Sequence, residues 1–413
     1  MNPPRRPRGG LAGWARLATL LNPARRRLLR AGLAGWAAPG LATLALPGVA
    51  AAAPAGAASA ADDDRIHPGR ALAFPRDHGA HAGARIEWWY ATGWLQAEGD
   101  GGGKAGKGAA LFGFQLTFFR SRTGVAESLP GRFAPRQLLF AHAALTDVAA
   151  RRHLHAQRLA RWSGDDTLPE AHARRADTGL ALGRWALQRD AASGGYRALL
   201  AAPEAGFSLD LQLAPTQPVL LQGQAGHSRK GPLPSQASHY YSQPQLAVQA
   251  QITLGGRRLA LPGRGWLDHE WSDELLAPGA VGWDWLGINL ADGGALTAFV
   301  LRRADGNVLW AGGSHRPAGG VVRNFTPEEV AFTPLRSWTS TDTGAHYPVH
   351  WRIGTPVGNF ELRALLDAQE LDSRASTGTV YWEGLAELLA PGGARAGLGY
   401  LEMTGRAQPL RLG

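Results

Sequence analysis

The chain has 413 residues and no cysteine, and its 43 basic residues outnumber its 33 acidic ones, which gives a formal net charge of +10. Eight of the arginines and none of the acids lie in residues 1–60, so the rest of the chain carries 35 basic and 33 acidic residues. This near balance removes the main support for nucleic-acid binding. The absence of cysteine excludes disulfide bonds and thiolate metal sites.

The first sixty residues have the pattern of an export signal. Residues 24–30 read Ala-Arg-Arg-Arg-Leu-Leu-Arg, a twin-arginine motif, and residues 31–53 carry no charge. Small residues at 51–53 and 58–60 provide cleavage sites. The alternative is a membrane anchor, but glycine and proline make the uncharged stretch only weakly hydrophobic. We therefore expect the twin-arginine machinery to export the protein to the periplasm or beyond, with residues 1–60 removed.

The remaining chain predicts an all-β fold. Apolar or alternating segments are separated by Gly, Pro, Asp and Asn, which is typical of antiparallel sandwiches or barrels. These segments are residues 85–96, 109–119, 137–147, 206–213, 246–254, 283–290, 295–302 and 347–353. The polar stretch 223–245 predicts a link between an N-terminal domain at 62–235 and a C-terminal domain at 246–413. Short helices are expected at 327–330 and 384–389.

The first concentration of tryptophan lies in residues 87–94, which read Glu-Trp-Trp-Tyr-Ala-Thr-Gly-Trp. In a strand, Glu87 and Trp89 face one side and Trp88 and Tyr90 face the other. One face must therefore place a carboxylate or a row of aromatic rings inside. The structural alternative is a packing motif at the barrel floor, in which Glu87 pairs with an arginine. The candidate arginines are Arg85 and Arg132.

The second concentration contains the residues most suited to catalysis. Residues 265–272 read Gly-Trp-Leu-Asp-His-Glu-Trp-Ser, and residues 282–285 add Gly-Trp-Asp-Trp. Strand alternation places Asp268 and Glu270 on one face with Trp266, and His269 on the other face with Leu267 and Trp271. Burial beside indole rings raises the pKa of a carboxyl group, which suits general acid–base catalysis. The structural alternative is a hydrogen-bonded polar cluster that closes a barrel end.

Other catalytic patterns fit poorly. Ser228 and Ser314 each lack the final glycine of a nucleophile elbow, and no second histidine follows His269 at the spacing of a zinc protease. His153 and His155 form only a weak pair for a metal. No phosphate-binding loop or dinucleotide fingerprint is present. We therefore expect neither a metal nor a cofactor.

Seven short segments together resemble the AttH-like predicted secreted hydrolases, which are related to carotenoid 1,2-hydratases (hydroxyneurosporene synthases) and fungal kievitone hydratases. The resemblance runs from about residue 66 to residue 405. The segments are 74–79 (Phe-Pro-Arg-Asp-His-Gly), 87–90 (Glu-Trp-Trp-Tyr), 238–242 (Ser-His-Tyr-Tyr-Ser), 267–271 (Leu-Asp-His-Glu-Trp), 282–285 (Gly-Trp-Asp-Trp), 381–384 (Tyr-Trp-Glu-Gly) and 399–402 (Gly-Tyr-Leu-Glu).

The resemblance implies two lipocalin-like β-barrels in tandem with a ligand cavity. The hydratases add water to an isolated alkene of an isoprenoid, which requires a protonated acid, an apolar pocket and aromatic faces that stabilise a cation. Asp268 would be the proton donor, with His269 as its partner or water activator. The hydratase pattern has Asn at the position of Glu270, which favours a different lipid substrate or none. Ligand-binding candidates are Glu87, Trp88, Trp89, Tyr90, Tyr240, Tyr241, Trp271, Trp283, Asp284, Trp285 and Glu383.

These observations leave three hypotheses. The first is an exported hydratase or hydrolase that acts on a lipophilic small molecule, with Asp268, His269 and Glu270 as its catalytic residues. The second is a non-catalytic, lipocalin-like carrier or envelope transport accessory protein, whose partners could include an ABC transporter. The third is a purely structural envelope protein, which predicts no cavity.

Overall fold

The computed structural model describes residues 64–96, 110–125 and 134–411, all within a compact unit that spans Ala57–Gly413. The predicted export signal lies outside these residues. Within the described ranges, no helix is long and apolar enough to cross a membrane. The structure is nearly all β, and its helical content is limited to short 3-10 turns such as η2 (Arg76–His78), η3 (Pro203–Ala205) and η4 (Pro327–Glu329).

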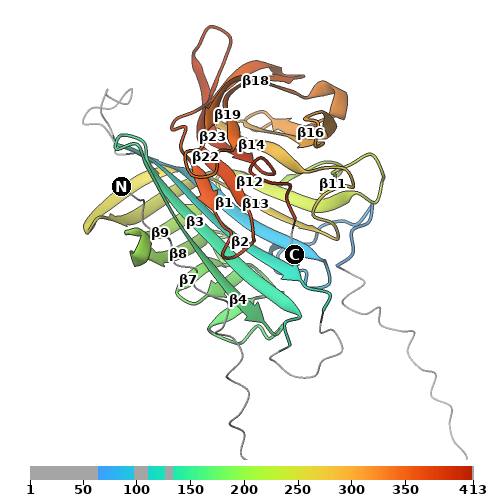
Figure 1. Ribbon diagram of the computed structural model, residues 1–413. Coiled ribbons are helices and arrows are strands. Elements are labelled where there is room, and N and C mark those ends of the chain that lie inside the picture. Colours follow the sequence, from blue (N-terminus) through green and yellow to red (C-terminus); the bar gives the residue numbers. More distant parts are fainter. Residues whose placement is uncertain (1–63, 97–109, 126–133, 412–413) are drawn as a thin grey trace, which may run out of the picture. The chain divides into compact units, whose positions relative to one another are not determined.

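The first sheet forms a nearly closed antiparallel barrel, with strand order β4-β3-β2-β1-β13-β12-β9-β8-β7-β6-β5 and with β10 and β11 paired to β12. Figure 1 shows β1 to β4 side by side. The strands are β1 (Ile86–Gln96), β2 (Leu111–Arg122), β3 (Gln137–Asp147), β4 (Arg152–Trp162), β5 (Ala171–Ala173), β6 (Gly179–Leu182), β7 (Trp185–Arg189), β8 (Tyr196–Ala202), β9 (Phe207–Ala214), β10 (Leu220–Leu221), β11 (His227–Arg229), β12 (Ala237–Leu254) and β13 (Arg257–Ser272).

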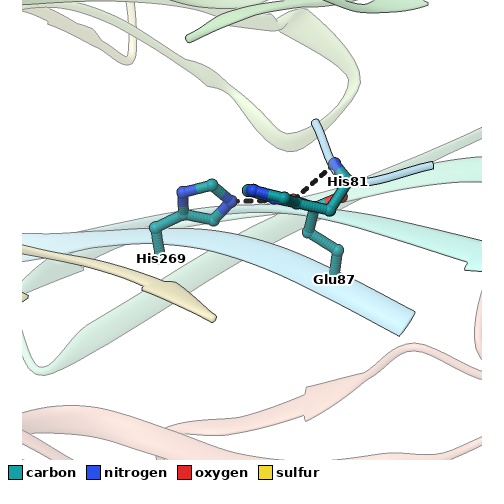
Figure 2. A group of neighbouring side chains, drawn as sticks. All are labelled: His81, Glu87 and His269. Carbon is teal, nitrogen blue, oxygen red and sulfur yellow. Dashed lines mark hydrogen bonds and ion pairs between the residues drawn. The ribbon is translucent and has the colours of Figure 1, made fainter. Parts of the chain in front are cut away.

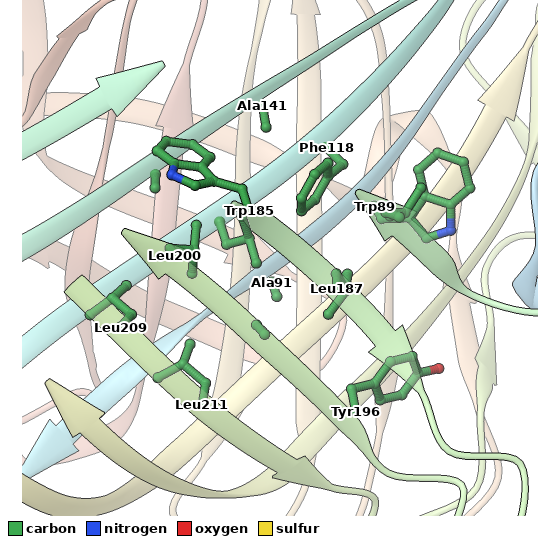
Figure 3. Close-up of a cluster of buried hydrophobic side chains, with 14 of the residues drawn as sticks. Trp89, Ala91, Phe118, Ala141, Trp185, Leu187, Tyr196, Leu200, Leu209 and Leu211 are labelled. Carbon is green, nitrogen blue, oxygen red and sulfur yellow. The ribbon is translucent and has the colours of Figure 1, made fainter. Parts of the chain in front are cut away.

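Side-chain alternation fills the barrel. Along β9, every second residue from Phe207 to Leu213 is buried, while the residues between them are more exposed. Figure 3 shows the resulting core, in which Trp185, Leu200 and Leu211 from one side meet Phe118 from the other. The period-two pattern therefore places one face of each strand in the barrel, as expected for an antiparallel sheet with a single core.

The second sheet forms a half-barrel, with strand order β17-β16-β15-β14-β23-β22-β20-β19-β18 and with β21 paired to β22. Its strands are β14 (Gly282–Leu290), β15 (Ala295–Arg302), β16 (Val308–Arg316), β17 (Arg323–Phe325), β18 (Ala331–Thr339), β19 (His346–Thr355), β20 (Gly358–Ala364), β21 (Glu370–Asp372), β22 (Val380–Leu389) and β23 (Arg395–Met403). The helix expected at 384–389 is wrong, because these residues continue β22 and every residue of that strand is buried. The helix expected at 327–330 corresponds to the single turn η4.

The division between the sheets differs from the predicted boundary at 235–246. Residues 246–272, which the sequence assigns to the C-terminal domain, lie in β12 and β13 and pair with β9 and β1 of the first sheet. The first sheet therefore ends at Ser272 and the second begins at Gly282. The polar stretch 223–245 looked like a link because its strands are short or mostly polar, yet β11 and the start of β12 lie within it.

The two sheets pack against each other across β1 and β13. Tyr90 and Trp266 from the first sheet share an apolar cluster with Trp285, Leu385 and Tyr400 from the second. The half of β13 from Gly265 to Ser272 is buried at every position, because one face lies in the barrel and the other faces the second sheet. This two-sided burial places the acidic residues of β13 out of bulk water.

Candidate functional site

Asp268 lies between the sheets and is only 3% exposed. Its Oδ1 accepts hydrogen bonds from Ser242 Oγ at 2.5 Å and Trp266 Nε1 at 2.7 Å, and its Oδ2 accepts one from the Tyr240 hydroxyl at 2.8 Å. Burial, with a smaller contribution from Glu270, raises the pKa of Asp268 to about 7, and the three donors only partly oppose this rise. An acid with this pKa can donate or accept a proton near neutral pH.

A chain of hydrogen bonds orients the Ser242 hydroxyl. Ser314 Oγ on β16 donates to Gln222 Oε1 at 2.7 Å, and Gln222 Nε2 donates to Ser242 Oγ at 2.8 Å. Because Ser242 accepts from the amide, its own proton is directed to Asp268. A residue of the second sheet thereby helps to orient the hydroxyl that contacts an acid on the first.

Glu270 is the second acid on this face of β13, and it has a cationic partner. Lys230 Nζ lies 3.1 Å from Glu270 Oε1. The same ammonium lies 4.6 Å from the ring centroid of Tyr240 and 4.4 Å from that of Phe299. The ammonium is thus held by one carboxylate and two aromatic faces, a typical cation–π arrangement.

Two further acids face Asp268 from the second sheet. Glu383 on β22 and Glu402 on β23 are directly opposite each other in the register. Burial and the neighbouring Glu402 raise the pKa of Glu383 well above its usual range, although Tyr90 and Tyr381 nearby partly lower it. Burial, together with the charges of Asp268 and Glu270, raises the pKa of Glu402 to about 7.

These acids line a cavity of about 140 Å³ between the sheets. Tryptophan, tyrosine and phenylalanine supply much of its wall, which gives it an apolar character with a few polar groups. The predicted residues that line it are Trp88, Tyr90, Tyr240, Asp268, Glu270, Trp283, Trp285 and Glu383; Glu87 also borders it, but its carboxylate points into the barrel. The structure therefore brings together most of the residues that the sequence pointed to.

His269 does not lie beside Asp268, which corrects its predicted role as the partner of that acid. It projects from the opposite face of β13 into the barrel, where its Nε2 lies 2.9 Å from Glu87 Oε1 and its Nδ1 lies 3.2 Å from the Tyr241 hydroxyl. Consecutive residues of a strand point to opposite faces, so Asp268 and His269 cannot share one pocket.

Four predicted ligand-binding residues also lie away from the cavity lining. Trp89, Tyr241 and Trp271 belong to the barrel core. Asp284 is fully buried and pairs with the guanidinium groups of Arg302 at 2.9 Å and Arg406 at 2.7 Å. Asp284 is therefore held by two arginines and stays out of the cavity.

His81, Glu87 and His269 form a second buried group, inside the barrel (Figure 2). Glu87 Oε1 lies 2.8 Å from His81 Nδ1 and 2.9 Å from His269 Nε2. Glu87 Oε2 accepts a hydrogen bond from Arg120 Nε at 2.8 Å, so its partner is Arg120 rather than the candidate Arg85, while the other candidate, Arg132, lies outside the described residues. Burial would raise the pKa of Glu87, but Arg120 and the histidines hold it well below its usual range.

The spacing of this group would suit a metal ion, because the three ligand atoms lie within 4.8 Å of one another. The charge balance does not. Arg120 pairs with Glu87, Arg70 lies 3.0 Å from Asp77, and Asp77 in turn bonds His81 Nε2 at 3.0 Å. A divalent cation would add two uncompensated charges to a fully buried site. We therefore interpret this group as a hydrogen-bonded structural cluster.

Sequence reasoning missed several lining residues, among them His142, Lys230, Tyr381 and Glu402. Tyr381 and Glu402 lie in the resembling segments, and Tyr381 shares a strand face with Glu383, so alternation could have identified it. Lys230 lies in the polar stretch 223–245, where no sequence pattern indicates that it reaches the cavity. His142 hydrogen bonds to Tyr381 and Ser376 at 2.8 Å each, and burial lowers its pKa to about 3, so it is neutral.

A family model described as AttH-like matches residues 65–406. The chain belongs to the AttH-like family. A crystal structure of a protein assigned to AttH from Nitrosomonas europaea is 44% identical, with a TM-score of 0.73, covering 83% of this chain and 99% of that one. Kievitone hydratase from Nectria haematococca is 13% identical, with a TM-score of 0.59, covering 81% and 93% respectively, and it shows the same fold. No curated protein sequence matches the chain.

The match confirms the predicted resemblance and the lipocalin-like all-β fold of this AttH-like protein. The family model extends over both sheets, so the cavity between them lies wholly within the matched region. Kievitone hydratase shares the fold, but at 13% identity a shared fold does not by itself show a shared reaction.

The raised pKa of Glu402 predicts a specific pH dependence of stability. The folded protein keeps a proton that the unfolded chain releases, so this group costs stability as the pH rises from about 4.5 to about 7. The variant Glu402→Gln should therefore gain stability relative to the wild type as the pH rises, and the gain should vanish in acid. Urea unfolding of both proteins across this range measures the difference, and a constant difference would contradict it.

Proposed function

We propose that this protein binds a lipophilic small molecule between its two sheets and catalyses the addition of water to an alkene of that molecule. The observation that carries the proposal is Asp268, a buried carboxyl group with a pKa of about 7 in an aromatic-walled cavity. Such a group is protonated in a large fraction of molecules at neutral pH and is still acidic enough to donate. The shared fold of kievitone hydratase supports a hydratase-like reaction.

The reaction balances with Asp268 alone. Its proton adds to the less substituted carbon of the alkene, and the other carbon becomes a tertiary cation. The faces of Trp283 and Trp285 at the cavity wall would stabilise this charge. Water then bonds to the cationic carbon and returns one proton to Asp268, which the donors Tyr240 and Ser242 have held as a carboxylate. The product is a tertiary alcohol, and the acid is restored.

The test uses oxygen-labelled water. The purified protein is incubated with squalene or with a mixed bacterial lipid extract, and mass spectrometry looks for molecules that have gained one labelled water. We expect a labelled alcohol that boiled protein does not form. Absence of any labelled product from both substrates would overturn the hydratase proposal and favour the non-catalytic carrier or envelope transport accessory, whose partners could include an ABC transporter.

We also propose that the protein is exported through the twin-arginine machinery to the periplasm or beyond. The support is the arginine motif at residues 24–30, followed by the uncharged stretch and small-residue cleavage sites. The double variant Arg26→Lys with Arg27→Lys should retain a full-length precursor in the cytoplasm. Cell fractionation with an antibody against the folded part measures this, and equal export of the variant would exclude the twin-arginine route.

A further inference from the structure

The acids of the cavity outnumber its cationic partners. Six acidic residues border it, namely Glu87, Asp268, Glu270, Glu274, Glu383 and Glu402, although the Glu87 carboxylate is turned into the barrel. Arg120 and Lys230 also line it, but they already pair with Glu87 and Glu270 respectively. The neutral His142 adds no charge. Within the part of the chain that the structure describes, Glu383 and Glu402 have no lysine or arginine partner.

Two polar atoms beside this acid pair are buried close to each other, yet among the described residues neither has a partner at ordinary hydrogen-bond geometry. They are Glu383 Oε1 and the Tyr90 hydroxyl oxygen, whose side chains both line the cavity. Glu383 is only 2% exposed and Tyr90 only 6%. A buried polar atom without a partner loses the hydrogen bonds that it made to water, so a ligand group that bonds both atoms would bind favourably.

The opposite wall of the cavity shows how the protein itself holds an ammonium group. Lys230 Nζ contacts the Glu270 carboxylate and lies over the rings of Tyr240 and Phe299. The acid pair Glu383 and Glu402 of the second sheet repeats these chemical elements without the cation, since it lies next to Tyr381 on β22 and Tyr90 on β1 of the first sheet. A ligand ammonium would complete this second set in the same way.

We propose that the ligand is an amphiphile with an apolar body and a protonated amine, and that the amine binds at Glu383, Glu402 and Tyr90. A hydroxyl group would satisfy the free hydrogen bonds but could not stabilise ionised carboxylates at the acid pair as an ammonium group does, and an anionic head group would be disfavoured beside these acids. This inference deepens the proposed function by naming the substrate class, and it assigns the ligand to the same cavity.

The test compares three probes that share one tail and differ in the head group: octylamine, octanol and octanoate. Isothermal titration calorimetry near neutral pH measures their binding to the full-length mature protein. We expect octylamine to bind at least about tenfold more tightly than octanol, as charge-assisted hydrogen bonds allow, with octanoate weakest. Equal binding of amine and alcohol, tighter binding of octanoate, or no binding of any probe would overturn the proposal.

The variant Glu383→Gln tests whether the ligand amine binds at Glu383. It should remove most of the preference for octylamine over octanol and leave octanol affinity unchanged, whereas Glu328→Gln at an exposed position outside the cavity lining should keep the preference. If Glu383→Gln does not fold, Tyr90→Phe removes one bonding atom and should lower only the octylamine affinity. An unchanged preference in the folded variant would overturn the assignment.

Proton release gives an independent measurement on the wild type. Because the amine favours ionised carboxylates, its binding should expel protons, and the measured enthalpy should vary with the ionisation enthalpy of the buffer. A buffer-independent enthalpy for octylamine would contradict the proposal. The two proposals can fail independently. If the octyl compounds bind as expected but no labelled alcohol forms in oxygen-labelled water, only the hydratase proposal is overturned.

Discussion

Asp268→Asn is expected to lower the rate of labelled-alcohol formation by about 10²- to 10⁴-fold, the usual contribution of a general acid. The amide has nearly the same shape: its oxygen can still accept from Ser242 and Trp266, and its NH2 group can donate to the Tyr240 oxygen, but it has no acidic proton to donate. The affinity for octanol should stay within about threefold, because the apolar walls are unchanged. Single-turnover mass spectrometry measures the rate, and calorimetry measures the affinity.

The matched control is Glu328→Gln, which also removes a carboxylate but at an exposed position outside the cavity lining. It should retain full activity. If Asp268→Asn also retains full activity, Asp268 is not the proton donor. If the wild type binds ligand but forms no product, and substitution of Trp283 weakens that binding, the carrier hypothesis explains the cavity better.

Arg120→Met is expected to lower the free energy of unfolding by about 3–5 kcal/mol, because it leaves the buried Glu87 carboxylate without its cation. Arg120 is 1% exposed, and its guanidinium group bonds Glu87 Oε2, Gln137 Oε1 and the backbone oxygens of His81 and Ala84. Methionine can fill the space but replaces none of these donors. Urea denaturation measures the change.

The matched control is Arg197→Met on β8, where the arginine pairs with Asp210 at 2.9 Å on the protein surface. Water screens this pair, so its loss should cost far less stability than the loss of Arg120. Similar losses for the two variants would contradict the structural role of the buried cluster. A metal-dependent stability of the wild type would likewise contradict our reading of the group formed by His81, Glu87 and His269.

Strand alternation predicted the faces of β1 and β13 correctly. Trp88 and Tyr90 share the cavity with Asp268 and Glu270, while Glu87 and Trp89 lie with His269 in the barrel. This part of the site was predictable because the side-chain period of a strand depends only on local backbone geometry. The same rule excluded a contact between His269 and Asp268, although their adjacency in the sequence had suggested a pair.

Strand pairing was not predictable in the same way. Glu402 lies opposite Glu383 only because β22 and β23 pair in one particular register. Lys230 reaches Glu270 from a segment that resembles a linker. Such contacts depend on long-range packing, which hydrophobic patterns do not specify. The boundary between the sheets was missed for a related reason, since β12 and β13 pair backwards with β9 and β1 rather than onward with β14.

The hydrogen bonds from Ser314 through Gln222 and Ser242 to Asp268 span both sheets. A small separation of the sheets would break this connection at Ser314, leave Gln222 free to turn, and release the serine proton from its fixed direction. The strength of the acid would then depend on how closely the half-barrel approaches the barrel. A substitution in the second sheet that does not contact the ligand or Asp268 would therefore change the pKa of Asp268.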